Sequence, residues 1–254
     1  MEHGGPHLGG ATTGPSGGPV LHSVHPLGRR ADTRRFHLPG VSDLCHLNAT
    51  QRRYKNGRNN RGAPLRSLIS TAFISLDGVV EAPGGEPGYR NSGWTFKDIE
   101  FESEAYDIKG REQSEAAALL LGRVSYEAFS PIWPGMQEFA GYKAMPKYVV
   151  STTLRVDDLA SNWGETTILR SLEDVAALKA TEGGPIIVHG SASLNQSLAD
   201  AGLIDRYHLL VYPLLLGAGK RLFSTTDKDA QKLQLVESKA YANGIQLNVF
   251  DVVR

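Results

Sequence analysis

Short apolar runs alternate with amphipathic stretches along the chain from about residue 65 to its end. Apolar runs bounded by Gly, Pro or Asp are typical of buried strands, and apolar positions spaced by three and four are typical of helices. Strands are predicted in 65–80, 116–122, 147–152, 167–170, 185–190 and 204–217 and at both ends of 232–253; helices are predicted in 96–116, 123–133, 171–180 and 191–202. This order indicates a largely parallel sheet covered by helices on both faces.

Capping and turn residues indicate where some of these helices and strands begin or end. Ser171 and Asp174 have the spacing of a capping box at a helix start, and Gly202 stands where a helix would end. Asn243-Gly244 predicts a type I′ hairpin between the last two strands.

Residues 1–64 have a different texture, with eleven Gly, six Pro and no sustained period of 2 or 3.6. Nine Lys or Arg against three acidic residues give this segment a charge of +6, which leaves −6 for residues 65–254. Such a segment cannot bury enough apolar surface to offset its ordering entropy. We therefore expect a disordered basic leader rich in Gly, Pro, His and Arg, followed by one domain over 65–254. A basic interaction arm, or translated sequence upstream of the true start, are the alternatives.

Composition narrows the class of protein further. The acidic body argues against nucleic-acid binding by the folded part. The only cysteine, Cys45, excludes intramolecular disulfides and a multi-cysteine zinc site, and no metal is expected. No apolar run approaches the ~20 residues that span a bilayer, and residues 1–25 lack the apolar core of a signal peptide. The expected location is the cytoplasm.

Four clusters with ligand-binding chemistry follow predicted strands: Asp77-Gly78, Gly122-Arg123, Ser151-Thr152-Thr153 and Gly190-Ser191-Ala192. Ligands of open α/β sheets bind beyond the carboxyl ends of the strands, so we expect the four clusters along one rim.

Each cluster also has a plain interpretation. The 190–192 stretch is either a tight turn or a cradle in which backbone N–H groups bind a phosphate. Arg123 is a bidentate phosphate ligand or a surface ion-pair partner. Ser151 to Thr153 offer hydroxyls to a ligand or cap a turn, and Asp77 binds an amino-substituted heterocycle or forms an Asx-turn.

Outside the clusters, Trp94 and Trp133 either wall a planar ring or belong to the core. The carboxylates between residues 98 and 107 are interpreted as a solvated helix face. His208, inside a predicted strand, is given no functional role.

The motifs "LISTAFISLDGVVEAPGG", "LLLGRVSYEAFSPIWP", "PKYVVSTTL" and "IIVHGSASLNQSLADAGLIDRYHLLVYPLLLGAGKRLF" occur in that order. Together they resemble the dihydrofolate reductase superfamily, in particular the C-terminal reductase domain of the bifunctional riboflavin-biosynthesis deaminase–reductase, over about Leu65 to Arg254. The resemblance implies a three-layer α/β/α sandwich with a mixed, mostly parallel sheet, an NADPH site and frequently a homodimer.

Carried over by position, the resemblance implies that Gly122 and Arg123 hold a cofactor phosphate. It likewise implies that Ser151, Thr152 and Thr153 lie near the adenosine ribose, and that Gly190, Ser191 and Ala192 turn over the pyrophosphate. The activity it implies is NADPH-dependent reduction of a pterin- or aminopyrimidine-type heterocycle, similar to the 5-amino-6-(5-phosphoribosylamino)uracil reductase of riboflavin biosynthesis. Asp77 is then the candidate that binds or polarises the acceptor, with Trp94 and Trp133 beside it.

Three departures bear on the substrate. Thr152 stands where members of this group often have Arg, and Val188 and His189 stand where the riboflavin-pathway reductases commonly place a substrate-binding Glu. One cysteine cannot supply the ligands of the zinc deaminase domain. Two rival interpretations stay open: a non-catalytic nucleotide- or pterin-binding module on the same fold, and a structural dimer formed through the strand "LLVYPLLLG".

Overall fold

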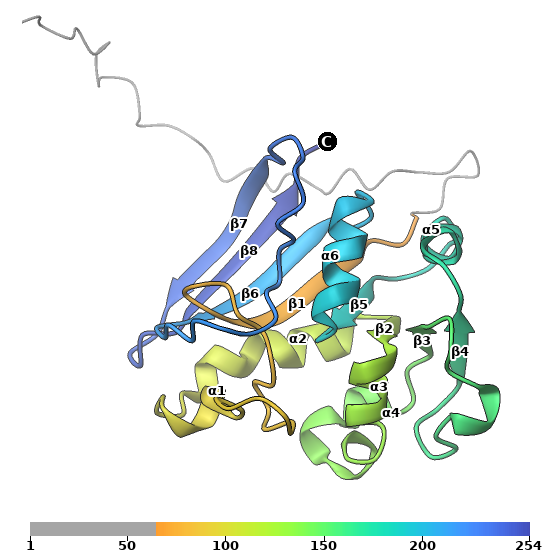
Figure 1. The fold of residues 1–254 in the computed structure, drawn as a ribbon, viewed down its shortest axis with the longest axis horizontal. Coiled ribbons are helices and arrows are strands. Elements are labelled where there is room, and N and C mark those ends of the chain that lie inside the picture. Colours follow the sequence, from red (N-terminus) through yellow and green to blue (C-terminus); the bar gives the residue numbers. More distant parts are fainter. Residues whose placement is uncertain (1–64) are drawn as a thin grey trace, which may run out of the picture. The chain divides into compact units, whose positions relative to one another are not determined.

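A computed structural model describes residues 65–254, and the predicted leader, 1–64, lies outside the described residues. Eight strands form one sheet in the order β4-β3-β2-β5-β1-β6-β8-β7 (Figure 1). The strands from β4 across to β6 pair in parallel, whereas β8 is antiparallel to both β6 and β7. The predicted mixed, mostly parallel sheet is confirmed.

The elements have the following bounds. The strands are β1 Leu68–Ser75, β2 Ala118–Gly122, β3 Lys147–Val150, β4 Thr166–Leu169, β5 Ile186–His189, β6 Arg206–Tyr212, β7 Leu233–Ala240 and β8 Gln246–Val252. The α-helices are α1 Trp94–Lys97, α2 Asp107–Glu115, α3 Arg123–Phe129, α4 Ala140–Lys143, α5 Leu172–Lys179 and α6 Ala192–Asp200.

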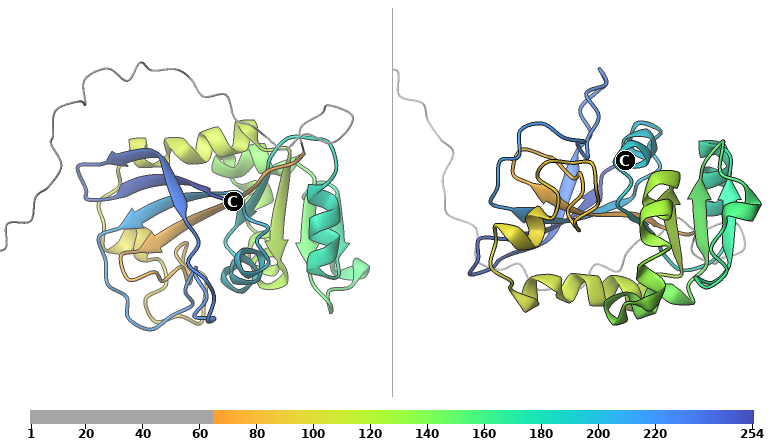
Figure 2. Two further views of the ribbon diagram at one scale, coloured as in Figure 1. Left: turned by 90° about the horizontal axis from the view of Figure 1, so that it is seen from above. Right: turned by 60° about the horizontal axis from the view of Figure 1, so that its bottom comes forward.

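Alternate residues of β1 face opposite layers of the molecule, as the pleat of a strand requires. Leu68 and Ile74 share an apolar cluster with Leu198 of α6. On the other face, Phe73 packs against a cluster that contains Ile108 of α2. Figure 2 (left) shows the sheet between α2 on one side and α5 and α6 on the other. This is the predicted three-layer arrangement.

Two elements differ from the sequence prediction. The helix predicted over 96–116 is divided into α1, a short 3₁₀ turn and α2. The strand predicted to reach residue 217 ends at Tyr212, because Pro213 has no N–H to continue the ladder. No helix among residues 65–254 is long and apolar enough to cross a membrane.

The last hairpin forms as predicted, but its turn is of another type. Gly244 has φ 85°, whereas Asn243 keeps a negative φ, which a type I′ turn does not allow. The side chain of Asn243 instead accepts a hydrogen bond from the N–H of Ile245 at 3.1 Å. The other two local predictions are confirmed: Ser171 and Asp174 form a capping box, and Gly202 follows α6 with φ 66°.

Candidate functional site

The four strands β3, β2, β5 and β1 are parallel neighbours, so their carboxyl ends lie along one edge of the sheet. This arrangement brings the four predicted clusters to one rim. We refer below to this edge, formed by residues 77–78, 122–123, 151–153 and 190–192, as the rim.

The turn at the end of β5 is built from two consecutive left-handed residues, Gly190 with φ 61° and Ser191 with φ 63°. The Asn195 amide holds this turn by donating to the carbonyl of Gly190 at 2.6 Å, while its oxygen accepts from the Ser70 hydroxyl at 2.7 Å. Among residues 65–254, no side chain caps the N-terminus of α6, and the N-cap residue Ser191 makes no capping hydrogen bond. The first N–H groups of the helix are therefore without the side-chain acceptor that would compete with an anion.

Gly190 is required for a reason that the sequence did not reveal. A Cβ at this position would lie 3.2 Å from Oγ of Ser125 and 3.3 Å from Cζ of Phe129, both on α3. The missing side chain thus makes room for α3, rather than for a ligand above the turn.

Three arginines stand at the rim, and one of them, Arg221, donates to the carbonyl of Asp77 and lies 3.9 Å from its carboxylate. Arg123, at the start of α3, is about half exposed and lies 3.8 Å from Glu127 in a weak surface pair. Arg170 follows β4, and its Nη1 donates to the carbonyls of Ser151 at 2.8 Å and Leu154 at 2.9 Å. The sequence analysis counted only Arg123, because Arg170 reaches the rim from the neighbouring strand.

The hydroxyl of Ser151 caps its own turn, since it accepts from the N–H groups of Thr153 at 3.2 Å and Leu154 at 2.9 Å. Thr152 and Thr153 are exposed. Of the three predicted hydroxyls in this cluster, these two are the ones that face solvent.

Asp77 has a structural task that differs from the one predicted. One carboxylate oxygen accepts from the Ser75 hydroxyl at 2.6 Å and from the N–H of Leu216 at 3.1 Å, and the other accepts from Gly217 at 2.8 Å. Burial would raise the pKa of Asp77, but these hydrogen bonds lower it overall. The carboxylate is therefore ionised and joins the loop after β6 to the end of β1, and its binding of a substrate stays a prediction.

Trp94 and Trp133, both predicted beside the substrate, lie in different apolar clusters of the fold. Trp94 is fully buried in the core beside Tyr212, and its Nε1 donates to the carbonyl of Glu81 at 2.8 Å, which corrects its predicted place in a ligand pocket. Trp133 lies near the rim: its ring stacks on Phe129 at 4.1 Å and stands perpendicular to His189 at 4.9 Å between centroids.

A buried polar row that the sequence analysis missed crosses the sheet on the α2 face. Thr71 of β1 is in register with His189 of β5 on one side and His208 of β6 on the other. Glu112 of α2 covers this row, and one of its oxygens accepts from the Thr71 hydroxyl at 2.6 Å and bonds Nδ1 of His208 at 2.9 Å. Lys109, one turn earlier, bonds both Thr71 and Glu112.

Burial and neighbouring charges shift the pKa values of two side chains in this row, Glu112 and His189. Burial would raise the pKa of Glu112, yet the charge of Lys109 and the hydrogen bond with His208 bring it down to about 2. Burial, aided by the charge of Lys109, lowers the pKa of His189 to about 3, so that this imidazole is neutral. Nδ1 of His189 and the hydroxyl of Tyr142 are buried without a hydrogen-bond partner among residues 65–254.

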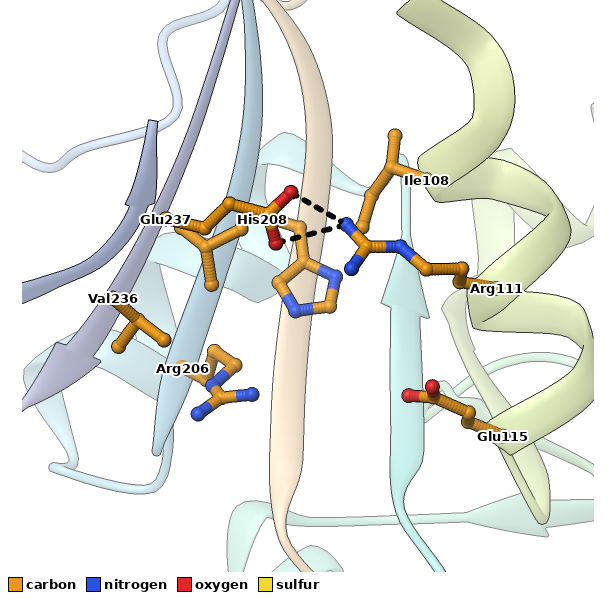
Figure 3. Close-up of a pocket in the computed structure, with 8 residues that line it drawn as sticks. Ile108, Arg111, Glu115, Arg206, His208, Val236 and Glu237 are labelled. Atoms are coloured by element: carbon orange, nitrogen blue, oxygen red, sulfur yellow. Dashed lines mark hydrogen bonds and ion pairs between the residues drawn. The ribbon is translucent and has the colours of Figure 1, made fainter. Parts of the chain in front are cut away.

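His208 also reaches solvent through a small pocket of about 60 Å³ between α2 and the strands β6, β8 and β7 (Figure 3). The ring of His208 stands between the guanidinium groups of Arg111 and Arg206, and Arg111 is paired with Glu237 at 3.0 Å. The full lining is Ile108, Arg111, Glu115, Arg206, His208, Val236, Glu237 and Val249.

The fold is that of a three-layer α/β protein with a mixed, mostly parallel sheet. The family model "RibD C-terminal domain" matches residues 66–247, and the chain belongs to this family. The resemblance seen in the sequence is thereby confirmed.

Individual relatives are more distant. The uncharacterized protein YyaP of Bacillus subtilis is 26% identical over 187 residues, which cover 71% of this chain and 92% of YyaP. A putative riboflavin biosynthesis protein from Shewanella sp. PV-4 superposes with a TM-score of 0.60 at 17% identity, covering 74% of this chain and 99% of that protein. A pyrimidine reductase-like protein from Corynebacterium diphtheriae gives 0.52 at 16%, covering 74% and 92%. At these identities the two structures establish the fold alone.

Proposed function

We propose that this protein is an NADPH-dependent reductase of a pterin- or aminopyrimidine-type heterocycle. One observation carries the proposal: the N–H of Gly122 donates to Oγ of Ser191 at 2.9 Å, which joins the end of β2 to the uncapped start of α6. A helix start that attracts anions and the half-exposed guanidinium of Arg123 thus belong to one structural unit.

The residues at the rim fit a phosphorylated dinucleotide. The N–H groups at the start of α6 would hold the pyrophosphate, and Arg123 with the exposed hydroxyls of Thr152 and Thr153 would hold the phosphate on the adenosine ribose. When bound, NADPH supplies the hydride. Trp133 is buried with its ring stacked between Phe129 and Phe139, each at 4.1 Å between centroids, so it is assigned to the core rather than to the wall of a ligand pocket.

Membership of the RibD C-terminal domain family supports a reductase activity. The substrate class is the part of the proposal that goes beyond family membership. The protein would resemble the 5-amino-6-(5-phosphoribosylamino)uracil reductase in reaction type. The proposal includes a cytoplasmic location and a homodimer, and light scattering of the purified protein tests the latter.

A thermal-shift series with NADPH, NADH and folates, followed by NADPH oxidation with pterins and aminopyrimidines, tests the function. A ligand at 100 times its Kd should add about 2.7 kcal/mol of stability. Tight NADPH binding without oxidation of NADPH by any acceptor would favour the binding module instead. Absence of any nucleotide binding would favour a structural dimer.

A further inference from the structure

The polar network around Glu112 has two distinct ends. At one end, Nδ1 of His208 bonds Glu112, while Nε2 has no partner among residues 65–254 and the ring lines the solvent pocket. At the other end, Lys109 lies over the ring of Phe73 at 4.9 Å. Phe73 is two residues nearer the carboxyl end of β1 than Thr71, so Lys109 lies on the side of the network that faces this strand end.

We propose that this network is a proton relay for the reduction: Lys109 protonates the substrate, and His208 takes up the replacement proton from the pocket. The inference rests on the proposed reductase function. Reduction of a carbon–nitrogen double bond consumes one proton for each hydride. In a site that excludes water, a protein side chain must deliver that proton.

The ammonium group of Lys109 has three N–H bonds, of which the network uses two, to Thr71 and Glu112. The third is available to a ligand. Hydride adds to carbon, the π electrons move to nitrogen, and nitrogen takes the proton from Nζ. One proton then enters at Nε2 of His208, while the Nδ1 proton passes to Glu112 and through Thr71 back to Nζ. Conversion of the imidazole from its Nε2–H to its Nδ1–H tautomer resets His208, and Glu112 ends each cycle as a carboxylate.

The arginine side chains around the relay are engaged in ion pairs of their own. Arg111 is paired with Glu237 and Arg206 with Asp251, so neither guanidinium replaces His208 as the partner of Glu112. The remaining titratable neighbours are Glu115 in the pocket, and His189 and Tyr142 at the inner side. Burial and the charge of Glu112 raise the pKa of Tyr142, so this phenol is no acid under ordinary conditions.

Lys109→Arg and Lys109→Met separate charge from proton donation. Arg keeps the ion pair with Glu112 but does not release a proton, whereas Met removes both. We expect both variants to lose on the order of 100-fold in kcat, the range of general acid catalysis, with an unchanged Kd for NADPH. A Lys109→Arg enzyme with normal kcat would show that only the charge matters and would overturn the proposal.

His208→Ala opens space in the pocket for an added base. Its kcat should fall about tenfold or more and rise again with imidazole concentration, whereas wild-type kcat should not depend on imidazole. His208→Gln, whose amide can still donate to Glu112, should show the same loss without rescue, and it replaces the alanine variant if that one fails to fold. Full activity of both variants would overturn the relay.

Glu104→Gln is the matched control, since Glu104 forms an exposed ion pair with Lys239 at 2.7 Å outside both the relay and the pocket. Its kcat should change less than about twofold, as expected for loss of an exposed ion pair. Failure of the wild type to bind or oxidise NADPH would instead count against the proposed function, which keeps the two tests separate.

Discussion

The N–H of Gly122 and the hydroxyl of Ser191 are joined at 2.9 Å across two neighbouring strands, β2 and β5, whose ends carry the proposed cofactor site. Ser191 accepts this bond while its own backbone is left-handed, with φ 63°. The contact therefore maintains the rim at the expense of local strain.

Substitution of Ser191 separates the two effects. Ser191→Ala loses the hydrogen bond and keeps the strain, so it should destabilise the fold by about 1–3 kcal/mol and weaken NADPH binding. Ser191→Gly also loses the bond but relaxes the backbone, and it should be about 1 kcal/mol more stable than the alanine variant. Urea unfolding of the three proteins measures this; equal stability of both variants would contradict the strain.

Gly190 and Gly202 form a second matched pair. Both have positive φ, 61° and 66°, but a Cβ at Gly190 would press on α3, whereas nothing lies within 4 Å of one at Gly202. Gly202→Ala should cost about 1 kcal/mol for its conformation alone, and Gly190→Ala should cost at least 1 kcal/mol more. Thermal unfolding decides between this steric explanation and a purely ligand-related role of Gly190, under which the two costs would be alike.

Arg123 should discriminate between the two nicotinamide cofactors. NADPH carries an extra phosphate on the adenosine ribose, and a charge-assisted hydrogen bond contributes about 1.5–3 kcal/mol. Arg123→Ala should therefore weaken NADPH binding about ten- to a hundredfold and barely change NADH, and Thr152→Arg should tighten NADPH and steepen its salt dependence. Calorimetry at two ionic strengths tests both variants. Equal losses for the two cofactors would assign Arg123 to the shared pyrophosphate.

His189 should make the fold sensitive to mild acid. The unfolded chain takes up a proton near pH 6.5, whereas the buried imidazole has a pKa of about 3, so falling pH favours unfolding. Between pH 7.5 and 5 the wild type should lose about 2 kcal/mol more than His189→Gln. Glu112 is separable, because its contribution is present above 4.5 and is lost only as pH falls toward 2. Parallel pH curves for the two proteins would contradict the buried neutral imidazole.

The sequence was informative wherever local pattern decides the structure. The rim clusters were predictable because each one follows an apolar strand, and the carboxyl ends of parallel strands share an edge. The strand end at Tyr212 was also readable from Pro213, although the apolar residues that follow hid it. The cores of the helices and strands followed from periodicity in the same way.

The buried row was not predictable in this way. Glu112 and His208 are 96 residues apart, and nothing in their local sequence links them. The signal was present only as polar residues inside apolar strands, at Thr71, His189 and His208, which require partners when buried. The role of Asp77 was missed for a related reason, since its donors at Leu216 and Gly217 come from a loop that only the fold brings near.

The position of β1 in the sheet has a consequence for synthesis. Its two neighbours are β5 and β6. Leu68 therefore cannot pair until Ile186, about 120 residues later in the chain, has been synthesised. At about 5–20 residues per second, a ribosome needs roughly 6 to 24 seconds to make that stretch. During this time β1, which is buried along nearly its whole length in the finished fold, has no partner edge on either side, and long-range parallel pairing is slow to form afterwards. The nascent chain is thus a candidate client for chaperones that bind exposed apolar strands.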